Sequence, residues 1–579
     1  MNKPQANAYE FGNFYVDTVK RLLIKGDGES VPLMPRAFDT LLYLVKHAGK
    51  VIGKDELLTA IWTDTIVEEN NLTQNISTLR RVFGEKHGEN RFIATIPGRG
   101  YKFVPEVRKK EGSKQIVSGE RFAQKSVAVL PFKPLVWENH DESLEMGMAD
   151  TLIARLGGNN QEVVFRPLAA VRKYGNLEQD PLAAGRELGV DSVLDGCIQR
   201  SGEKIRVSVR LIKTADGTSL WAGTFDEKFT DIFAVQDSIS ERVAAALQIR
   251  LGGEKKKRST ENIEAYQLYM KGRFHVARVT PTEIQTGISY FRQAIEIDSS
   301  YALAYVGLAD AYMRLSIAGE LPSTKFFPQS KAAANKAIEI DDTLAEAYVI
   351  LGWILFWYDW NWNEAEKQCR RALELDPNSA DAHEAYAHLL SNTGRHAEGL
   401  LEIKRARELS PPSLFINALE GQFLLHARQI DEALDRLRKT FELEPNFWLA
   451  HLFAASTYME KEMFAEAACE ANKAMQFSGG SSHAAAFGAY ALAKLGKQTE
   501  ARTALEELLK LSTVRYVPPY HIALIYNGLD EPEETLSWLE RGFQERDTKM
   551  VFLKVEPKWS NLHSEPRFVD LMKRMKLQQ

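Results

Sequence analysis

The stretch 380–411, ADAHEAYAHLLSNTGRHAEGLLEIKRARELSP, decides the fold of the larger part of this chain. Its apolar and small residues recur at helical spacing, in two groups: Tyr386, Ala387, Leu390, then Leu400, Ile403, Ala406. Gly394 stands where the first group ends and Pro411 where the second must end, because neither residue continues a helix well. The stretch therefore predicts two short helices joined by a tight turn.

The end of this unit recurs along the chain at a nearly constant interval. The related phrases are AIEID (294–298), AIEID (337–341), ALELDP (372–377), ARELSP (406–411), TFELEP (440–445) and AMQFS (474–478). Their first residues are separated by 43, 35, 34, 34 and 34 positions, and further steps of 34 lead to Leu508 and Gly542. A fixed period of this length indicates a stacked repeat protein, here of about eight units.

The unit resembles the tetratricopeptide repeat. That family places a small residue at its eighth position, and the corresponding residues here are Gly352, Ala387, Gly421, Ala455 and Ala489. It also places alanine where the two helices touch, matched here by Ala365, Ala433, Ala467 and Ala501, with Gly399 in the same register. The resemblance implies an all-α superhelix whose concave groove binds a protein or peptide ligand. The stretch 555–576 departs from the pattern and is predicted to cap the stack.

An aromatic-rich stretch, FWYDWNWNEAE (356–366), interrupts the polar pattern of the array. Its Trp357, Trp360 and Trp362 either form an exposed binding patch or pack between neighbouring repeats.

The N-terminal part has a different pattern. Residues 9–33 show short alternating runs typical of small antiparallel strands, and three amphipathic helices follow. The third begins at Asn70, and its buried stripe falls at Leu72, Ile76, Leu79 and Phe83. Its opposite face carries Asn71, Gln74, Asn75, Thr78 and Arg81. FIATIPGRGYKFV (92–104) then predicts a hairpin. Amides and arginines exposed on a helix are the groups that read base edges in a DNA major groove.

This part resembles the winged helix-turn-helix domain of OmpR-type response regulators and CadC-type transcription activators. The resemblance rests on Leu79-Arg80-Arg81 at the end of the third helix and on Gly98-Arg99-Gly100-Tyr101 in the hairpin. It implies binding to double-stranded DNA through Asn71, Asn75, Thr78, Arg80, Arg81, Arg99 and Tyr101. The alternative for each is a solvated surface side chain. The acidic turn Thr63–Glu69 either contacts RNA polymerase, as the corresponding loop of the family can, or is a capped helix connection.

Residues 126–251 alternate strand and helix patterns and resemble the TolB-like α/β domain, on the cues AVLPF, MGMAD, LGVDSVLDG and IFAVQDSI. The predicted fold is thus multidomain: a winged-helix (α+β) head, an α/β middle domain and an all-α tetratricopeptide superhelix. The predicted boundaries are 1–107 for the head, 108–125 for a linker, 126–252 for the middle domain, 253–260 for a second linker and 261–579 for the array with its cap.

The charge distribution agrees with a chain that touches DNA at one end. Residues 1–110 hold 17 Lys and Arg against 13 Asp and Glu, a net charge of +4. The whole chain has a net charge of −5, so the remaining residues have a net charge of −9. The beginning of the sequence is not typical of a secretion signal, and no apolar run is long enough to span a membrane. Three scattered cysteines suit a reducing compartment, so we expect a cytoplasmic bacterial protein without a membrane partner.

No phosphate-binding loop, nucleophile elbow or zinc-binding helix motif occurs in the sequence. We therefore expect no enzymatic activity, no metal and no cofactor. The favoured function is a sequence-specific transcriptional regulator whose repeat array binds a protein or peptide partner. The alternative is an interaction scaffold whose winged helix docks protein rather than DNA.

Overall fold

The structure is a computed structural model. It describes residues 8–17, 22–25, 30–31, 35–61, 69–85, 89–110, 125–134, 141–157, 163–175, 179–247, 260–278, 280–317 and 321–577. The chain divides into two compact units, Met1–Phe122 and Ala123–Gln579. Among the described residues, no helix has both the length and the apolar character needed to span a bilayer.

The first unit is a winged helix with two small sheets. The five-stranded sheet has the order β4-β3-β2-β1-β8, with bounds β1 (Ala8–Phe11), β2 (Phe14–Asp17), β3 (Leu22–Lys25), β4 (Ser30–Val31) and β8 (Arg108–Lys110). Three helices follow the first four strands: α1 (Pro35–Lys46), α2 (Lys54–Ile61) and α3 (Glu69–Val82). The second sheet has the order β5-β7-β6, with bounds β5 (Val51–Ile52), β6 (Ile93–Ile96) and β7 (Gly100–Phe103).

Aromatic rings form the centre of this unit's core. The ring centroids of Phe11 and Phe103 lie 4.9 Å apart, and those of Phe83 and Phe92 lie 4.8 Å apart. The strands and the three helices agree with the sequence prediction, but the predicted linker 108–125 begins inside a strand. Arg108–Lys110 pairs antiparallel with β1, because the otherwise open edge of β1 offers backbone groups that a following segment can satisfy.

The second unit begins with a six-stranded mixed sheet. Its main path is β11-β9-β12-β13-β14, and β10 pairs with β12. The strands are β9 (Lys125–Val129), β10 (Lys133–Pro134), β11 (Val163–Phe165), β12 (Ser192–Ser201), β13 (Lys204–Lys213) and β14 (Ser219–Lys228). The helices are α4 (Glu142–Gly157), α5 (Leu168–Val171), α6 (Pro181–Glu187) and α7 (Ile232–Leu247), with short 3₁₀ turns at Arg172–Tyr174 and Phe229–Asp231.

Alternate residues of β9 point to opposite faces of this sheet, as a strand requires. Val127 and Val129 lie in the large core that also holds residues of α4 and α7. Ala128 lies in a separate small core formed with α5 and α6. The mixture of strands and helices agrees with the α/β fold that the sequence predicts for the middle domain.

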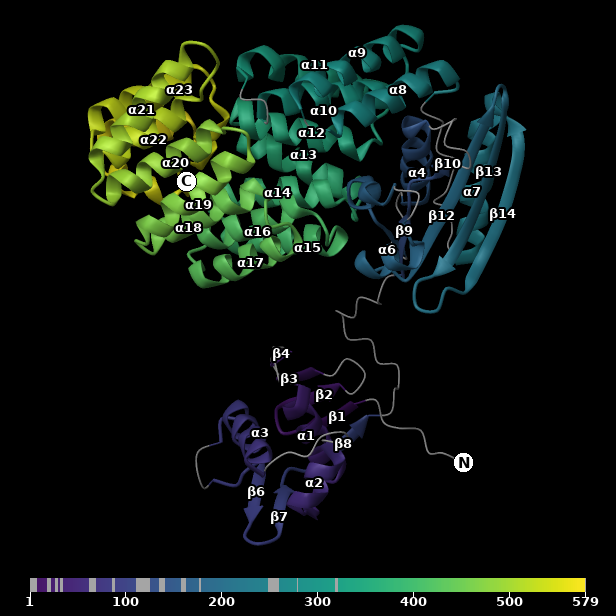
Figure 1. The fold of residues 1–579 in the computed structure, drawn as a ribbon, viewed down its shortest axis with the longest axis vertical. Coiled ribbons are helices and arrows are strands. Elements are labelled where there is room, and N and C mark those ends of the chain that lie inside the picture. Colours follow the sequence, from purple (N-terminus) through teal and green to yellow (C-terminus); the bar gives the residue numbers. More distant parts are fainter. Residues whose placement is uncertain are drawn as a thin grey trace. The chain divides into compact units, whose positions relative to one another are not determined.

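Eight antiparallel helix pairs follow among the described residues, as the 34-residue period predicts (Figure 1). The pairs are α8 (Ile263–Val276) with α9 (Pro281–Ile297), α10 (Ala302–Ile317) with α11 (Ser323–Ile340), α12 (Ala345–Ile354) with α13 (Trp362–Leu375), α14 (Ala380–Asn392) with α15 (His396–Leu409), α16 (Leu414–His426) with α17 (Ile430–Leu443), α18 (Trp448–Glu460) with α19 (Phe464–Phe477), α20 (Ser482–Lys494) with α21 (Gln498–Ser512), and α22 (Pro519–Gly528) with α23 (Pro532–Gln544). We number these pairs as repeats 1 to 8.

The small residues predicted at the helix contacts are buried. Ala387, Ala455 and Ala365 have no exposed surface. A Cβ atom added to Gly421 would lie 2.7 Å from Cγ of Leu437, so the two helices of repeat 5 approach more closely than a larger residue allows.

The tryptophan-rich stretch packs rather than forming an exposed patch. Trp357 and Trp360 are buried, and the indole nitrogen of Trp362 donates a hydrogen bond to the carbonyl oxygen of Met575, 2.9 Å away. Trp360 also lies 5.3 Å from the ring of Phe543 at the end of repeat 8. The array thus turns until its last repeat contacts its third.

The end of the chain does more than cap the stack. The final helix, α24 (Pro566–Arg574), ion-pairs with α23 through Arg574 and Glu540. Before it, two 3₁₀ turns, η5 (Thr548–Phe552) and η6 (Pro557–Leu562), contact the first helices of several repeats. We call residues 547–562 the C-terminal segment, and we call the surface of the repeats that it contacts the inner face.

A buried arginine joins the middle domain to the array. The guanidinium of Arg166 donates to the carbonyl oxygens of Leu188 and Gly189 at the end of α6. It also donates to those of Glu408 and Leu409 at the end of α15, at 2.8 and 3.0 Å. The last carbonyls of a helix lack partners within it, so one cation satisfies two helix ends at once. The middle domain and repeat 4 are therefore directly connected.

Candidate nucleic-acid interface

Helix α3 presents one polar face to solvent. Leu72, Ile76 and Leu79 are buried, with at most 2% of their surface exposed. The exposed positions described on the helix are Thr73, Gln74, Ser77 and Arg81. Gln74, Ser77 and Arg81 follow one another at steps of three and four, so they share the side opposite the buried stripe. Thr73 and Ser77 were not among the residues predicted from the sequence, although the same spacing places Ser77 between Gln74 and Arg81.

Two predicted contacts of α3 are less available, and a third lies outside the described side chains. Asn75 and Thr78 are half-buried, and the amide nitrogen of Asn75 donates to the hydroxyl of Thr40 at 3.1 Å. Thr40 is fully buried on α1, so in this structure Asn75 ties the two helices together. The backbone of Asn71 belongs to α3, but its side chain lies outside the described part of the chain.

Arg80 and Arg81 have different surroundings. The guanidinium of Arg80 donates to the carbonyl oxygen of Ile93, with its Nη2 atom 2.7 Å away, and to the hydroxyl of Thr95 at 2.8 Å. Both acceptors belong to β6, so Arg80 fastens α3 to the hairpin. Arg81, one position further around the helix, is exposed. Arg81 is therefore available to a phosphate or base edge, whereas Arg80 sets the geometry of the surface.

The hairpin of β6 and β7 carries Arg99 at its tip. Residues 97–99 are exposed, and the chain turns through Gly98 and Gly100, both with positive φ. A Cβ atom on Gly100 would lie 2.0 Å from the carbonyl oxygen of Ile52, so β7 passes β5 too closely for any side chain there. Tyr101, the next residue, is only 5% exposed and its backbone is paired with Ile52. Its ring packs in the core, and its DNA contact stays a prediction.

A buried carboxylate fixes the other end of the hairpin. Glu85, 7% exposed, accepts hydrogen bonds from the backbone nitrogens of Phe92 and Ile93. It lies three residues after the end of α3, so it holds the start of β6 close to that helix. Sequence reasoning missed this residue, because nothing in the polar stretch around it signals a buried partner.

The arrangement therefore joins an exposed polar helix face and an exposed arginine at a hairpin tip into one fixed surface. Arg80 and Glu85 help to hold the two parts together. Backbone-directed cations beside side chains that can hydrogen-bond to bases are what DNA recognition needs. The predicted acidic turn Thr63–Glu69 is represented only by Glu69, because residues 62–68 lie outside those described.

Three family models match successive parts of the chain. Residues 28–103 match the family model "Transcriptional regulatory protein, C terminal". Residues 123–242 match the "HilA/YgeH-like transcriptional regulator, second domain" model, and residues 368–400 match a tetratricopeptide repeat model.

Individual relatives cover different shares of the chain. The transcriptional regulator HilA of Salmonella typhi is 24% identical over 450 residues, covering 76% of this chain and 70% of that protein. A putative adenylate cyclase 3 of Rhizobium meliloti is 29% identical over 242 residues, 41% of each chain. Among solved structures, the DNA-binding domain of Escherichia coli CadC is 30% identical, with a TM-score of 0.17, and covers 18% of this chain and all of that one.

The class of protein follows from these findings and the fold. The head is similar to the DNA-binding domains of OmpR-type transcriptional regulators, and over most of its length the chain is similar to the regulator HilA. Its second domain is HilA-like and its third part is a tetratricopeptide array.

Proposed function

We propose that the chain is a sequence-specific DNA-binding regulator whose repeat array receives a protein or peptide partner. The observation that carries the first half is the joint surface of Gln74, Ser77 and Arg81 on α3 with Arg99 on the hairpin. The helix side chains supply groups for base edges, and the two arginines supply cations for the phosphate backbone. Among the residues predicted from the sequence, Arg81 and Arg99 are the strongest candidates; Asn71, Asn75, Thr78, Arg80 and Tyr101 remain proposed contacts of lower rank.

Other features of the proposal rest on the sequence. Thr63–Glu69 stays a proposed contact for RNA polymerase. The TolB-like character of the middle domain and a cytoplasmic location also remain predictions. We propose no catalytic activity, since the sequence contains none of the catalytic motifs considered above. Partner binding by the array is supported by the general use of such repeats as binding surfaces.

The test is selection of DNA fragments from a random pool with the full chain, followed by binding measurements on the enriched sequence. Arg81→Ala and Arg99→Ala should each weaken binding about tenfold, since each removes a cation from the surface. Lys367→Ala is the matched control. It removes one charge from a 72%-exposed lysine on α13 and should leave DNA affinity unchanged.

The scaffold alternative predicts a different outcome. A pool that shows no enrichment, or three variants that bind DNA equally, would favour a head that docks protein.

A further inference from the structure

The C-terminal segment runs along the inner face of the array and contacts one repeat after another. The ring of Phe552 lies 5.8 Å from Trp357 of repeat 3 and 6.2 Å from His426 of repeat 5. Nζ of Lys554 donates to the carbonyl oxygen of Thr393 in repeat 4, 2.8 Å away.

The contacts continue in the same direction to the last repeat. Nζ of Lys558 donates to the hydroxyl of Ser456 in repeat 6 at 2.6 Å and lies 4.3 Å from the ring centroid of Phe487 in repeat 7. The amide nitrogen of Asn527 in repeat 8 donates to the backbone oxygen of Lys558, 2.6 Å away. Trp559, fully buried, donates through its indole nitrogen to the hydroxyl of Tyr520 at 2.9 Å.

This pattern is that of a peptide ligand rather than of a ninth repeat. The segment contains two 3₁₀ turns and no helix pair, and its anchoring side chains contact repeats 3 to 8. The concave side of stacked helix pairs is an extended surface of the kind that takes such a segment.

The segment buries a charge pair against the inner face. Glu556 and Lys558 are 5% and 4% exposed, and they contact each other and the hydroxyl of Ser456. Removing two charges from water costs several kcal/mol, and their attraction returns that cost only with good geometry.

Several buried polar atoms of the inner helices have no hydrogen-bond partner in the described structure. They are Asn392 Oδ1 and His388 Nδ1 on α14, Gln422 Oε1 and His426 Nε2 on α16, and His521 Nε2 on α22. Each unsatisfied buried group costs about 1–3 kcal/mol.

From these contacts we infer that the inner face of repeats 3 to 8 is a peptide groove, and that residues 547–562 are its resident ligand. The partner that displaces them is a protein segment of the same chemistry: an aromatic residue, then Glu-x-Lys-Trp beginning four positions later. This inference deepens the proposed partner-binding role of the array and rests on it. It does not depend on DNA binding by the head.

The test uses a fluorescent peptide with the sequence of residues 546–563 and the full chain. A chain with Phe552→Ala and Lys558→Ala, whose resident segment is weakened, should bind this peptide at least tenfold more tightly than the unaltered chain. The tethered segment competes at a high effective concentration, so weakening it exposes the groove. A peptide carrying the same two substitutions is the matched control and should bind neither chain.

Three results would overturn the inference. One is a folded double variant that fails to bind the peptide. Another is equal binding of the native and substituted peptides. The third is formation of a dimer by exchange of the segment, because the groove would then serve a second copy of this chain. DNA affinity measured on the same samples separates failure of this inference from failure of the proposed function.

If the double variant does not fold, hydrogen exchange on the unaltered chain provides a second test. Amides of residues 548–562 should exchange by a local opening, faster than those of α16 and α18. Exchange of both regions only through global unfolding would make the segment a permanent part of the core and contradict the inference.

Discussion

At the scale of single residues, two adjacent arginines illustrate what a sequence motif can and cannot show. Arg80 and Arg81 both belong to the motif on which the family resemblance rests. The helical period places Arg81 opposite the buried stripe, so its exposure could be predicted from the sequence. Arg80's hydrogen bonds to Ile93 and Thr95 could not, because they depend on where a hairpin 13 residues away comes to lie.

Gly100 provides a sharp residue-scale prediction. Gly100→Ala should destabilise the head by about 2–4 kcal/mol, because the residue has a φ of +126° and its Cβ would meet the carbonyl of Ile52. Gly98→Ala is the matched control, with a φ of +70° and open space around the added carbon, and should cost about 1 kcal/mol. Thermal unfolding of the two variants measures the difference. Equal losses would mean that β7 does not pass β5 this closely.

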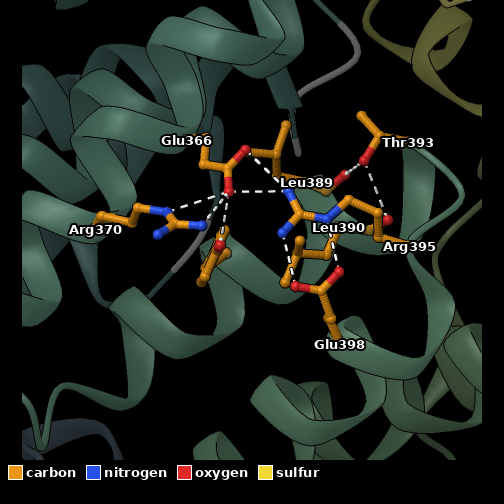
Figure 2. Close-up of polar contacts among 8 residues, drawn as sticks. Glu366, Arg370, Leu389, Leu390, Thr393, Arg395 and Glu398 are labelled. Carbon is orange, nitrogen blue, oxygen red and sulfur yellow. Dashed lines mark hydrogen bonds and ion pairs between the residues drawn. The ribbon is translucent and has the colours of Figure 1, made fainter. Parts of the chain in front are cut away.

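At the scale of elements, neighbouring repeats are joined by networks of polar side chains in addition to apolar contacts. Figure 2 shows the carboxylate of Glu366 on α13 receiving hydrogen bonds from Arg370 and from Arg395, which lies at the start of the second helix of repeat 4. Arg395 also donates to Glu398. Figure 2 further shows that the hydroxyl of Thr393 donates hydrogen bonds to the carbonyl oxygens of Leu389 and Leu390 in the preceding helix. The carbonyl oxygen of Thr393 accepts the hydrogen bond from Lys554 of the C-terminal segment.

This network predicts a specific dependence of stability on pH. Burial by itself would raise the pKa of Glu366, but hydrogen bonds from Arg395, Arg370 and Tyr386 outweigh it and lower the pKa to about 2. Since the pKa is lower in the folded chain, the stabilisation is complete above the ordinary value near 4.5 and is lost as pH falls toward 2.

Glu366→Gln should therefore reduce the free energy of unfolding by about 2 kcal/mol at pH 7, and the difference should shrink below pH 4.5. Glu398→Gln is the control, because Glu398 is 55% exposed and its pair with Arg395 is screened by solvent. Denaturant titrations at pH 7, 4.5 and 3.5 provide the measurement. A difference that stays constant with pH would exclude the ionised carboxylate as the source.

The helix pairs themselves were predictable because their signals are local. The 34-residue period and the small residues at Ala387 and Gly421 fix each pair without reference to distant parts of the chain. β8 and the C-terminal segment were not predictable, because each is defined by a surface formed far away in sequence. The sequence could not decide whether Trp357 is buried for the same reason, since the ring that it contacts belongs to Phe552, which is distant in the sequence.

At the scale of the whole molecule, we expect buried histidines to make the stability of the array depend on pH. Burial lowers the pKa of His388 to about 3 and that of His426 to about 4. Burial also lowers the pKa of His483 and His521 well below the ordinary value. His426 faces Glu556, which opposes the shift, and Lys558, His396 and Arg428, which add to it. The positive charge of Lys549 also lowers the pKa of the other three histidines, His388, His483 and His521. His426 further lowers the pKa of His388, and Lys558 that of His483.

These histidines are neutral in the folded chain, and their pKa is lower there than in the unfolded chain. The free energy of unfolding is therefore not reduced by their protonation above about pH 6.5, and it falls as the pH drops below that value. Hydrogen exchange of the C-terminal segment should accelerate between pH 7 and pH 5, after correction for the intrinsic rate. His426→Gln, which cannot take up the proton, should reduce the acceleration. A segment whose protection does not change over this range would contradict the coupling.

The central claim concerns the head: its exposed helix face and hairpin tip bind DNA as one surface that Arg80 holds together. The most direct measurement is the salt dependence of DNA affinity for the full chain, with Arg81→Ala and Arg80→Ala compared. Arg81→Ala should lower the slope of log affinity against log salt by about 1 without changing thermal stability. Arg80→Ala should lower both affinity and stability, because α3 loses its attachment to β6. An affinity that does not depend on salt, or an Arg81→Ala variant with an unchanged slope, would contradict the account.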